Sequence, residues 1–169
     1  IFRLAVPYAG LILSTRERPQ MRDELLSLGI SQVSAASCTG VGGYKLEHDG
    51  QADDTAQFSP DDHRSVDEVL TSICQQGYLP SYCTACYRRG RTGEHFMELA
   101  KEGQIQEFCQ PNAIITFKEY LLDYASPATR KLGEETIANQ LEEITDQAMR
   151  QETIKRLNRL EQGERDLYF

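Results

Sequence analysis

The first third of the chain alternates between strand-like apolar runs and a helix-like stretch, and this pattern restricts the fold more than any other feature. The apolar run at residues 10–15 predicts a short buried strand. Pro19 and Gly29 then bracket a predicted helix, because proline favours the first helical turn and glycine the position after the last. Residues 30–36 predict a second strand. Strand, helix and strand in succession indicate a parallel sheet covered by helices.

A second helix and a third strand are predicted after a long acidic connection at residues 39–62. Ser65 and Glu68 have the spacing of a capping box, in which each side chain bonds a backbone N–H at the start of a helix. Residues 78–82 predict a third strand that leads directly into a cysteine. Three strands cannot close a barrel, so the α/β segment is either an open sheet or the last part of a larger (β/α) barrel.

From residue 84 onward the pattern becomes helical. Thr116 and Glu119 have capping-box spacing and predict a helix start. Three apolar stripes at helical spacing follow, and they predict core-facing helix surfaces. Their members are Phe117, Tyr120, Leu121 and Tyr124; Ile137, Leu141 and Ile144; and Ile154, Leu157 and Leu160. We therefore expect one domain over residues 1–83 and a mostly helical domain over residues 84–169.

Charge and hydropathy exclude two classes of partner. The net charge of the 169-residue chain is −8, and residues 47–68 alone hold eight acids against one arginine. A nucleic-acid surface requires a basic excess, so none is expected. No apolar stretch approaches the roughly 20 residues of a membrane span, so no membrane partner is expected either. The odd number of cysteines, five, and the lack of a secretion signal favour a reducing compartment such as the cytoplasm.

Three of the cysteines have a spacing typical of metal ligands. Cys83 and Cys86 form a C-x2-C pair, and 22 residues separate Cys86 from Cys109. This spacing fits an iron–sulfur cluster, a zinc ion with His95 as fourth ligand, a redox pair, or ordinary buried thiols. Arginines at 88, 89 and 91 would stabilise an anionic thiolate cluster, or they form a surface patch with no partner. Cys38 and Cys74 have no partner at ligand spacing and are expected to be buried.

Several longer motifs carry a resemblance to a known family. They are CTACYRRGRTGEHFM from residue 83, CQPN from 109, LILSTRE at 11–17, SQVSAASCTGVGGY at 31–44, FKEYLLDYAS at 117–126 and GERDLYF at 163–169. Over essentially the whole chain these motifs resemble the C-terminal part of the HydG family, the radical-SAM tyrosine lyases of iron-only hydrogenase maturation. The resemblance implies that residues 1–83 are the last βα units of a radical-SAM TIM-type barrel, followed by the helical domain.

The resemblance also implies an activity and its cofactors. The family cleaves L-tyrosine to p-cresol and makes carbon monoxide and cyanide ligands on iron, alongside other hydrogenase maturation proteins. Cys83, Cys86 and Cys109 match the ligands of an auxiliary 4Fe-4S cluster, which leaves one iron open to an extra iron through a bound free cysteine. A second 4Fe-4S cluster and S-adenosyl-L-methionine belong to an N-terminal part. The radical-SAM signature C-x3-C-x2-C is absent here, so we expect this chain alone to be inactive.

A substrate site is expected at Ser14, Thr15 and Arg16, because barrels keep their active residues at the C-terminal ends of strands. Arg16 would hold the tyrosine carboxylate with two parallel hydrogen bonds. Otherwise it forms an ordinary ion pair with Glu17 or Glu24. The alternative for the chain as a whole is a stand-alone metal-binding module, with an iron–sulfur cluster or zinc and without catalytic activity.

Overall fold

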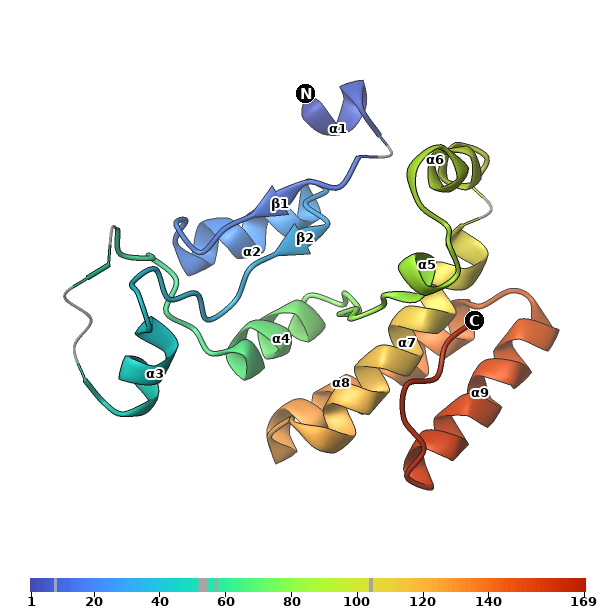
Figure 1. Ribbon diagram of the computed structural model, residues 1–169. Helices are drawn as coiled ribbons and strands as arrows, with labels where there is room; N and C mark the ends of the chain where they lie inside the picture. Colours follow the sequence, from blue (N-terminus) through green and yellow to red (C-terminus); the bar gives the residue numbers. More distant parts are fainter. Residues whose placement is uncertain (8, 52–54, 57, 104) are drawn as a thin grey trace. The chain divides into compact units, whose positions relative to one another are not determined.

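The computed structural model describes residues 1–7, 9–51, 55–56, 58–103 and 105–169 (Figure 1). It contains two compact units, residues 1–69 and 70–169. The predicted domain boundary after residue 83 stays a prediction. The helices are α1 (Phe2–Ala5), α2 (Pro19–Ser27), α3 (Gly43–His48), α4 (Val66–Gln75), α5 (Ala85–Arg88), α6 (Gly93–Lys101), α7 (Gln106–Asp123), α8 (Pro127–Glu143) and α9 (Gln147–Glu161). None of the helices in the described ranges is long and apolar enough to cross a membrane.

The N-terminal unit contains the predicted strand–helix–strand arrangement. β1 (Ile12–Leu13) and β2 (Gln32–Val33) pair in parallel, with Ile12 opposite Gln32, and α2 connects them. The prediction of a parallel pair with a crossover helix is therefore confirmed. Each strand is only two residues long, much shorter than predicted, since a two-stranded sheet gives each strand one neighbour and little pairing. As predicted, Pro19 is the first residue of α2, and Gly29 has a φ of +96° just beyond its end.

The acidic connection is not a continuous loop, because α3 lies within it. Residues 52–54 and 57 of this connection lie outside the described residues. The capping box at its end is confirmed. The Ser65 N–H donates to Glu68 Oε2 at 2.8 Å, and the Glu68 N–H donates to Ser65 Oγ at 3.3 Å. The Ser65 N–H and the Ser65 hydroxyl both donate to the Glu68 carboxylate, and these two bonds lower the pKa of Glu68.

The predicted third strand at residues 78–82 is wrong. This segment is irregular, and its last residue bonds to a helix side chain, with the Tyr82 N–H donating to Thr116 Oγ1 at 3.2 Å. Pro80 lies in its middle and has no N–H to donate to a sheet. The Tyr82 ring stacks on that of Tyr120 with centroids 5.1 Å apart. Tyr82 therefore packs against α7 instead of pairing in a sheet.

The helix start predicted at Thr116 is also wrong, because α7 begins ten residues earlier, at Gln106. The Thr116 hydroxyl donates to the carbonyl of Asn112 at 2.9 Å, so it bonds the preceding turn of its own helix. A Ser/Thr-x-x-Glu pattern marks a helix start only where the hydroxyl accepts from a backbone N–H, and spacing alone does not distinguish the two cases.

The core of the C-terminal unit lies where α7 packs on α8 and α9 (Figure 1). Ile114, Ile115 and Phe117 are fully buried there. The close approach of α7 and α8 requires a glycine, since a Cβ on Gly133 would lie 2.6 Å from Leu121 Cδ1. Most stripe residues are buried or half-buried as predicted, but Tyr124 is exposed.

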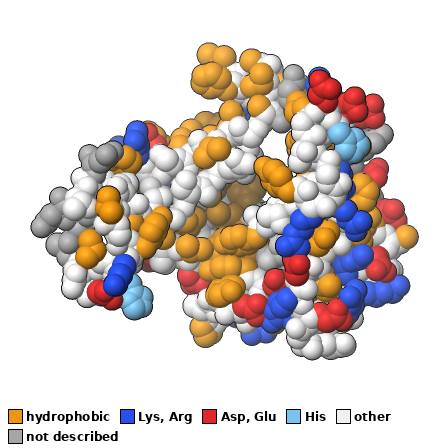
Figure 2. Space-filling view, in the orientation of Figure 1, with side chains coloured by type: hydrophobic (Ala, Val, Ile, Leu, Met, Phe, Trp, Pro, Cys, Tyr) orange, Lys and Arg blue, Asp and Glu red, His pale blue; other side chains and the backbone are white. Residues whose placement is uncertain are grey.

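One buried cation joins the three long helices. Lys118 on α7 is 5% exposed, and its Nζ donates to Glu134 at 2.7 Å and to Glu161 at 2.8 Å. Burial lowers the pKa of Lys118, but these two hydrogen bonds outweigh burial and raise it. Elsewhere on the visible face of this unit, basic and acidic side chains are interspersed (Figure 2).

Candidate metal centre

The three predicted cluster cysteines lie in the C-terminal unit, each on a different structural segment. Cys83 ends the irregular segment, Cys86 lies within the single turn of α5, and Cys109 lies in the first turns of α7. The first two are half-buried and the third is exposed. The Ala85 N–H donates to Cys83 Sγ at 3.4 Å, so the backbone of α5 already supports this sulfur.

Cys109 is distant in sequence from the C-x2-C pair, but it lies near enough for the charges of that pair to act on its thiol. Although the residue as a whole is exposed, partial burial of the thiol raises the pKa of Cys109, the charges of Cys86 and Cys83 raise it further, and Arg91 opposes them. Within the described ranges, no three His, Cys, Asp or Glu side chains are arranged to hold a single metal ion. A cluster with a separate iron for each thiolate requires ligands that stand further apart than those of a single ion.

The arginines that follow the C-x2-C pair contact the last residues of the chain. Arg88 forms an ion pair with Asp166, and both Arg88 and Arg89 lie over the Tyr168 ring. Arg91 Nη2 donates to the carbonyl of Phe169 at 3.0 Å. The sequence reasoning did not assign this last segment to the site. Only its match to the GERDLYF motif marked it, because a contact over 78 residues leaves no local pattern.

Two further features fit an anionic cluster at this position. Arg91 supplies positive charge beside Cys109, and its Nε is buried with no hydrogen-bond partner in the described structure. A buried donor of this kind is normally satisfied, so an acceptor is expected there. Sulfur atoms of an iron–sulfur cluster accept such bonds. The chemistry of the residues present therefore fits the 4Fe-4S cluster that the family resemblance implies.

The remaining cysteines lie away from this set in the sequence. Cys74 on α4 is buried, and burial raises its pKa, as expected for an ordinary core thiol. Cys38 is half-buried. Neither residue alters the set formed by Cys83, Cys86 and Cys109.

The predicted substrate residues lie in the N-terminal unit directly after β1. Ser14 is exposed, and its Oγ accepts from the Arg16 N–H at 3.4 Å. Thr15 is 3% exposed. Arg16 is exposed, with its guanidinium carbon 4.0 Å from the centroid of the Phe58 ring. Among the described residues it forms this contact rather than an ion pair with Glu17 or Glu24.

A buried polar network holds the end of β1. The N–H groups of Asp61 and Asp62 both donate to the Thr15 carbonyl, at 2.9 and 3.0 Å. Asp62 in turn pairs with Arg22 and Arg64, and its side chain is fully buried. Burial raises the pKa of Asp62, but hydrogen bonds from Arg64 and the charge of Arg22 outweigh it and lower the pKa to about 2. The position of the Ser14–Arg16 segment thus depends on this carboxylate.

Comparisons with known proteins found one set of relatives for the N-terminal half of the chain and one for the whole chain. Residues 1–79 match the family described as the Biotin and Thiamin Synthesis associated domain. The same length of chain is 43% identical to the 2-iminoacetate synthases of Salmonella typhimurium and Escherichia coli, covering 47% of this chain and 20% of each relative. The N-terminal half therefore resembles a domain associated with biotin and thiamin synthesis proteins.

The resemblance that covers the whole chain is to a particular protein. The crystal structure of HydG, described as a maturase of the [FeFe]-hydrogenase, matches 99% of this chain with 59% identity and a TM-score of 0.91. The chain covers 35% of that structure. The resemblance to the C-terminal portion of HydG that the motifs indicated is thereby confirmed.

Proposed function

We propose that this chain is the C-terminal part of a radical-SAM tyrosine lyase, and that Cys83, Cys86 and Cys109 hold its auxiliary 4Fe-4S cluster. The observation that carries the proposal is that Cys109, distant in sequence, lies near enough to the C-x2-C pair for the charges of Cys86 and Cys83 to add to burial in raising its pKa, in a chain 59% identical to HydG.

The full-length protein would cleave L-tyrosine to p-cresol and provide carbon monoxide and cyanide on iron for other hydrogenase maturation proteins. S-adenosyl-L-methionine and a second 4Fe-4S cluster would be bound by a more N-terminal part. When bound, the auxiliary cluster supplies an iron that no protein thiolate occupies, which is open to the extra iron and free cysteine. The three thiolates of this chain anchor it, and Arg91 offsets their negative charge.

The N-terminal unit would supply the substrate contacts. Arg16 is exposed at the end of β1, and among the described residues its side chain contacts the Phe58 ring and forms no ion pair, so its N–H groups are available to a carboxylate. The Ser14 hydroxyl, also exposed, would add a hydrogen bond. Thr15 is buried, and its carbonyl is bonded to the Asp61–Asp62 backbone. Thr15 would therefore mainly hold Ser14 and Arg16 in position, and its buried hydroxyl would contact only a substrate group that lies directly against it. We place this activity in the cytoplasm.

Anaerobic reconstitution with iron and sulfide tests the cluster. We expect about four irons per chain and a 4Fe-4S EPR signal. A Cys83→Ala/Cys86→Ala/Cys109→Ala variant should bind none, while the matched Cys38→Ala/Cys74→Ala variant should bind as much as the original. Equal iron in the triple variant contradicts the proposal. Zinc in place of iron, before and after reconstitution, supports the stand-alone metal-binding module.

The activity is tested separately by p-cresol release from tyrosine with S-adenosyl-L-methionine and a reductant. The full-length protein should turn over. This chain alone should release no p-cresol, because it lacks the C-x3-C-x2-C signature. Turnover by the isolated chain would contradict the proposal that a more N-terminal part binds S-adenosyl-L-methionine and the second cluster.

A further inference from the structure

Arg91 is fixed on two sides by contacts, and its buried Nε has no hydrogen-bond partner among the described residues. Its Nη2 donates to the Phe169 carbonyl at 3.0 Å, and its guanidinium carbon lies 5.1 Å from the centroid of the Phe108 ring. A guanidinium has five N–H donors in a rigid plane, so fixing one end fixes the direction of the others. The Nε of Arg91 is buried and has no partner in the described structure.

The position of Arg91 links both parts of the cysteine set. Its backbone N–H donates to the Cys86 carbonyl at 2.8 Å, so it is tied to the C-x2-C turn. The ring it covers, Phe108, immediately precedes Cys109. The backbone of Arg91 is therefore tied to one cluster cysteine, and its guanidinium lies over the residue that precedes another.

We propose that Arg91 donates its Nε–H to a sulfur of the bound 4Fe-4S cluster and thereby raises the reduction potential of that cluster. The acceptor is either the Cys109 thiolate or an inorganic sulfide. Hydrogen bonds to cluster sulfurs and nearby positive charge stabilise the more negative, reduced state. This inference rests on the proposed function, since it requires the cluster to be present.

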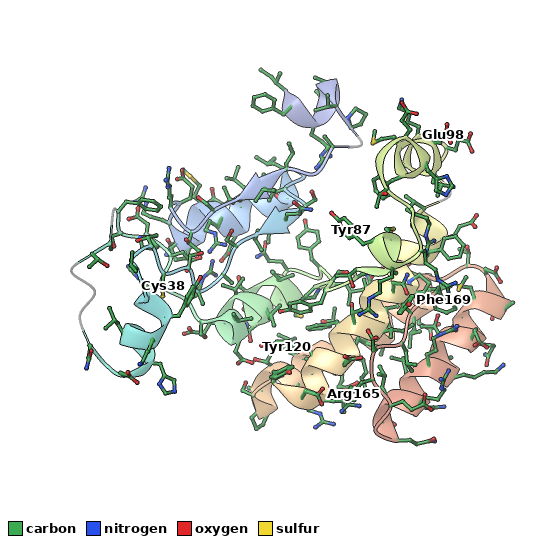
Figure 3. All side chains as sticks on the ribbon, in the orientation of Figure 1. Cys38, Tyr87, Glu98, Tyr120, Arg165 and Phe169 are labelled. Carbon is green, nitrogen blue, oxygen red and sulfur yellow. The ribbon has the colours of Figure 1, made fainter. Side chains whose placement is uncertain are left out.

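The last residues of the chain act as a positioning element for Arg91. The Phe169 N–H donates to Asn112 Oδ1 at 2.8 Å, and Asn112 is 2% exposed on α7. The Phe169 ring lies under the guanidinium of Arg156 on α9, 3.7 Å from its carbon. In Figure 3, Phe169 points into the space between α7 and α9. The carbonyl that holds Arg91 is thus itself held by two helices.

The neighbouring arginines provide a matched control. Arg89 carries the same charge two residues away, is exposed, and lies over the Tyr168 ring at 5.5 Å. It lacks the buried Nε that distinguishes Arg91. An effect of charge alone would appear in both variants, whereas an effect of a directed hydrogen bond would appear only at Arg91.

The test is an EPR-monitored redox titration of the reconstituted 169-residue chain, which carries only this cluster. Arg91→Gln should shift the midpoint potential to more negative values, and Arg89→Gln should leave it close to the original. Arg91→Lys keeps the charge but has no Nε, so it should shift the potential less than Arg91→Gln. Deleting residues 166–169 should shift it in the same direction as Arg91→Gln, because Arg91 loses the carbonyl that holds it.

The outcomes separate this inference from the proposed function. Equal potentials for Arg91→Gln and Arg89→Gln, with iron content unchanged, overturn the role of Arg91 and leave the cluster assignment intact. An original chain that takes up no iron overturns both. If Arg91→Gln fails to keep its cluster, the Arg91→Lys variant and the 166–169 deletion decide, and unshifted potentials in both count against the inference.

Discussion

Replacing Asp62 by asparagine should destabilise the N-terminal unit by about 3 kcal/mol and remove most of its acid sensitivity. The Asp62 side chain is fully buried, and the Arg22 side chain that it pairs with is 2% exposed. Removing the charge of one partner in such a pair leaves the other buried and uncompensated, which costs about 3–5 kcal/mol. The lower end applies because an amide retains one acceptor and Arg22 also donates to the Ser34 carbonyl.

The pH dependence follows from the same carboxylate. Arg64 and Arg22 outweigh the effect of burial and lower the pKa of Asp62 from 3.8 to about 2. At about 1.4 kcal/mol per pH unit, this difference is worth roughly 2 kcal/mol. A group with a lowered folded-state pKa stabilises the fold above its unfolded pKa. Its contribution is therefore complete above pH 4 to 5 and is lost as the pH falls toward 2.

Native-state hydrogen exchange of the α2 amides measures this unit by itself. The free energy of opening should be about 3 kcal/mol lower in Asp62→Asn at pH 5, with a difference of only about 1 kcal/mol at pH 2. Asp61→Asn is the matched control, because Asp61 donates the neighbouring backbone N–H to Thr15 but its side chain is exposed. If the two variants lose the same stability, or if the Asp62 difference does not change with pH, the reasoning is refuted.

Three further changes test the core and the substrate site. Lys118→Met should lower the free energy of unfolding by about 1–2 kcal/mol in urea, less than for a fully buried pair because its two glutamates can rehydrate. Gly133→Ala should cost a net 1–2 kcal/mol, since overpacking outweighs the gain in helix propensity. Arg16→Lys in the full-length protein should weaken tyrosine binding about tenfold, since lysine lacks the two-pronged donor.

Each of these has an outcome that contradicts it. Wild-type stability in Lys118→Met would mean that burial of the ammonium costs as much as its two bonds contribute. In a double-mutant cycle, Leu121→Ala should relieve the clash of Gly133→Ala, and strictly additive losses would contradict the close contact. An unchanged tyrosine affinity in Arg16→Lys, by equilibrium binding, would count against its role.

The sequence predicted the elements of the fold that depend on residues close together in the chain. The parallel pair and the Ser65–Glu68 capping box follow from short-range patterns that the structure confirms. The prediction of a strand at residues 78–82 failed because Tyr82 packs on α7, a tertiary contact that strand propensity does not include. The helix start expected at Thr116 failed because the same residues also suit a helix interior.

The candidate site also has parts that the sequence predicted and parts that it could not predict. The spacing of Cys83, Cys86 and Cys109 indicated thiolate ligands but left zinc and redox readings open, and the family motifs favoured iron. The sequence showed that arginines at 88, 89 and 91 follow the C-x2-C pair, but it did not show what they contact. The contacts of Arg91 and Asn112 with Phe169 could not be predicted, because nothing near residue 91 in the sequence specifies a partner 78 residues away.

The contact between Arg91 and Phe169 also fixes an order of events during synthesis. The 78 residues that separate them take roughly 4–16 s to translate at about 5–20 residues per second. Throughout that interval the C-x2-C thiols exist while the carbonyl that aligns Arg91 does not. Insertion of the proposed cluster into a fully formed site would therefore follow translation of this segment. Until then, the cell has to keep these cysteines reduced.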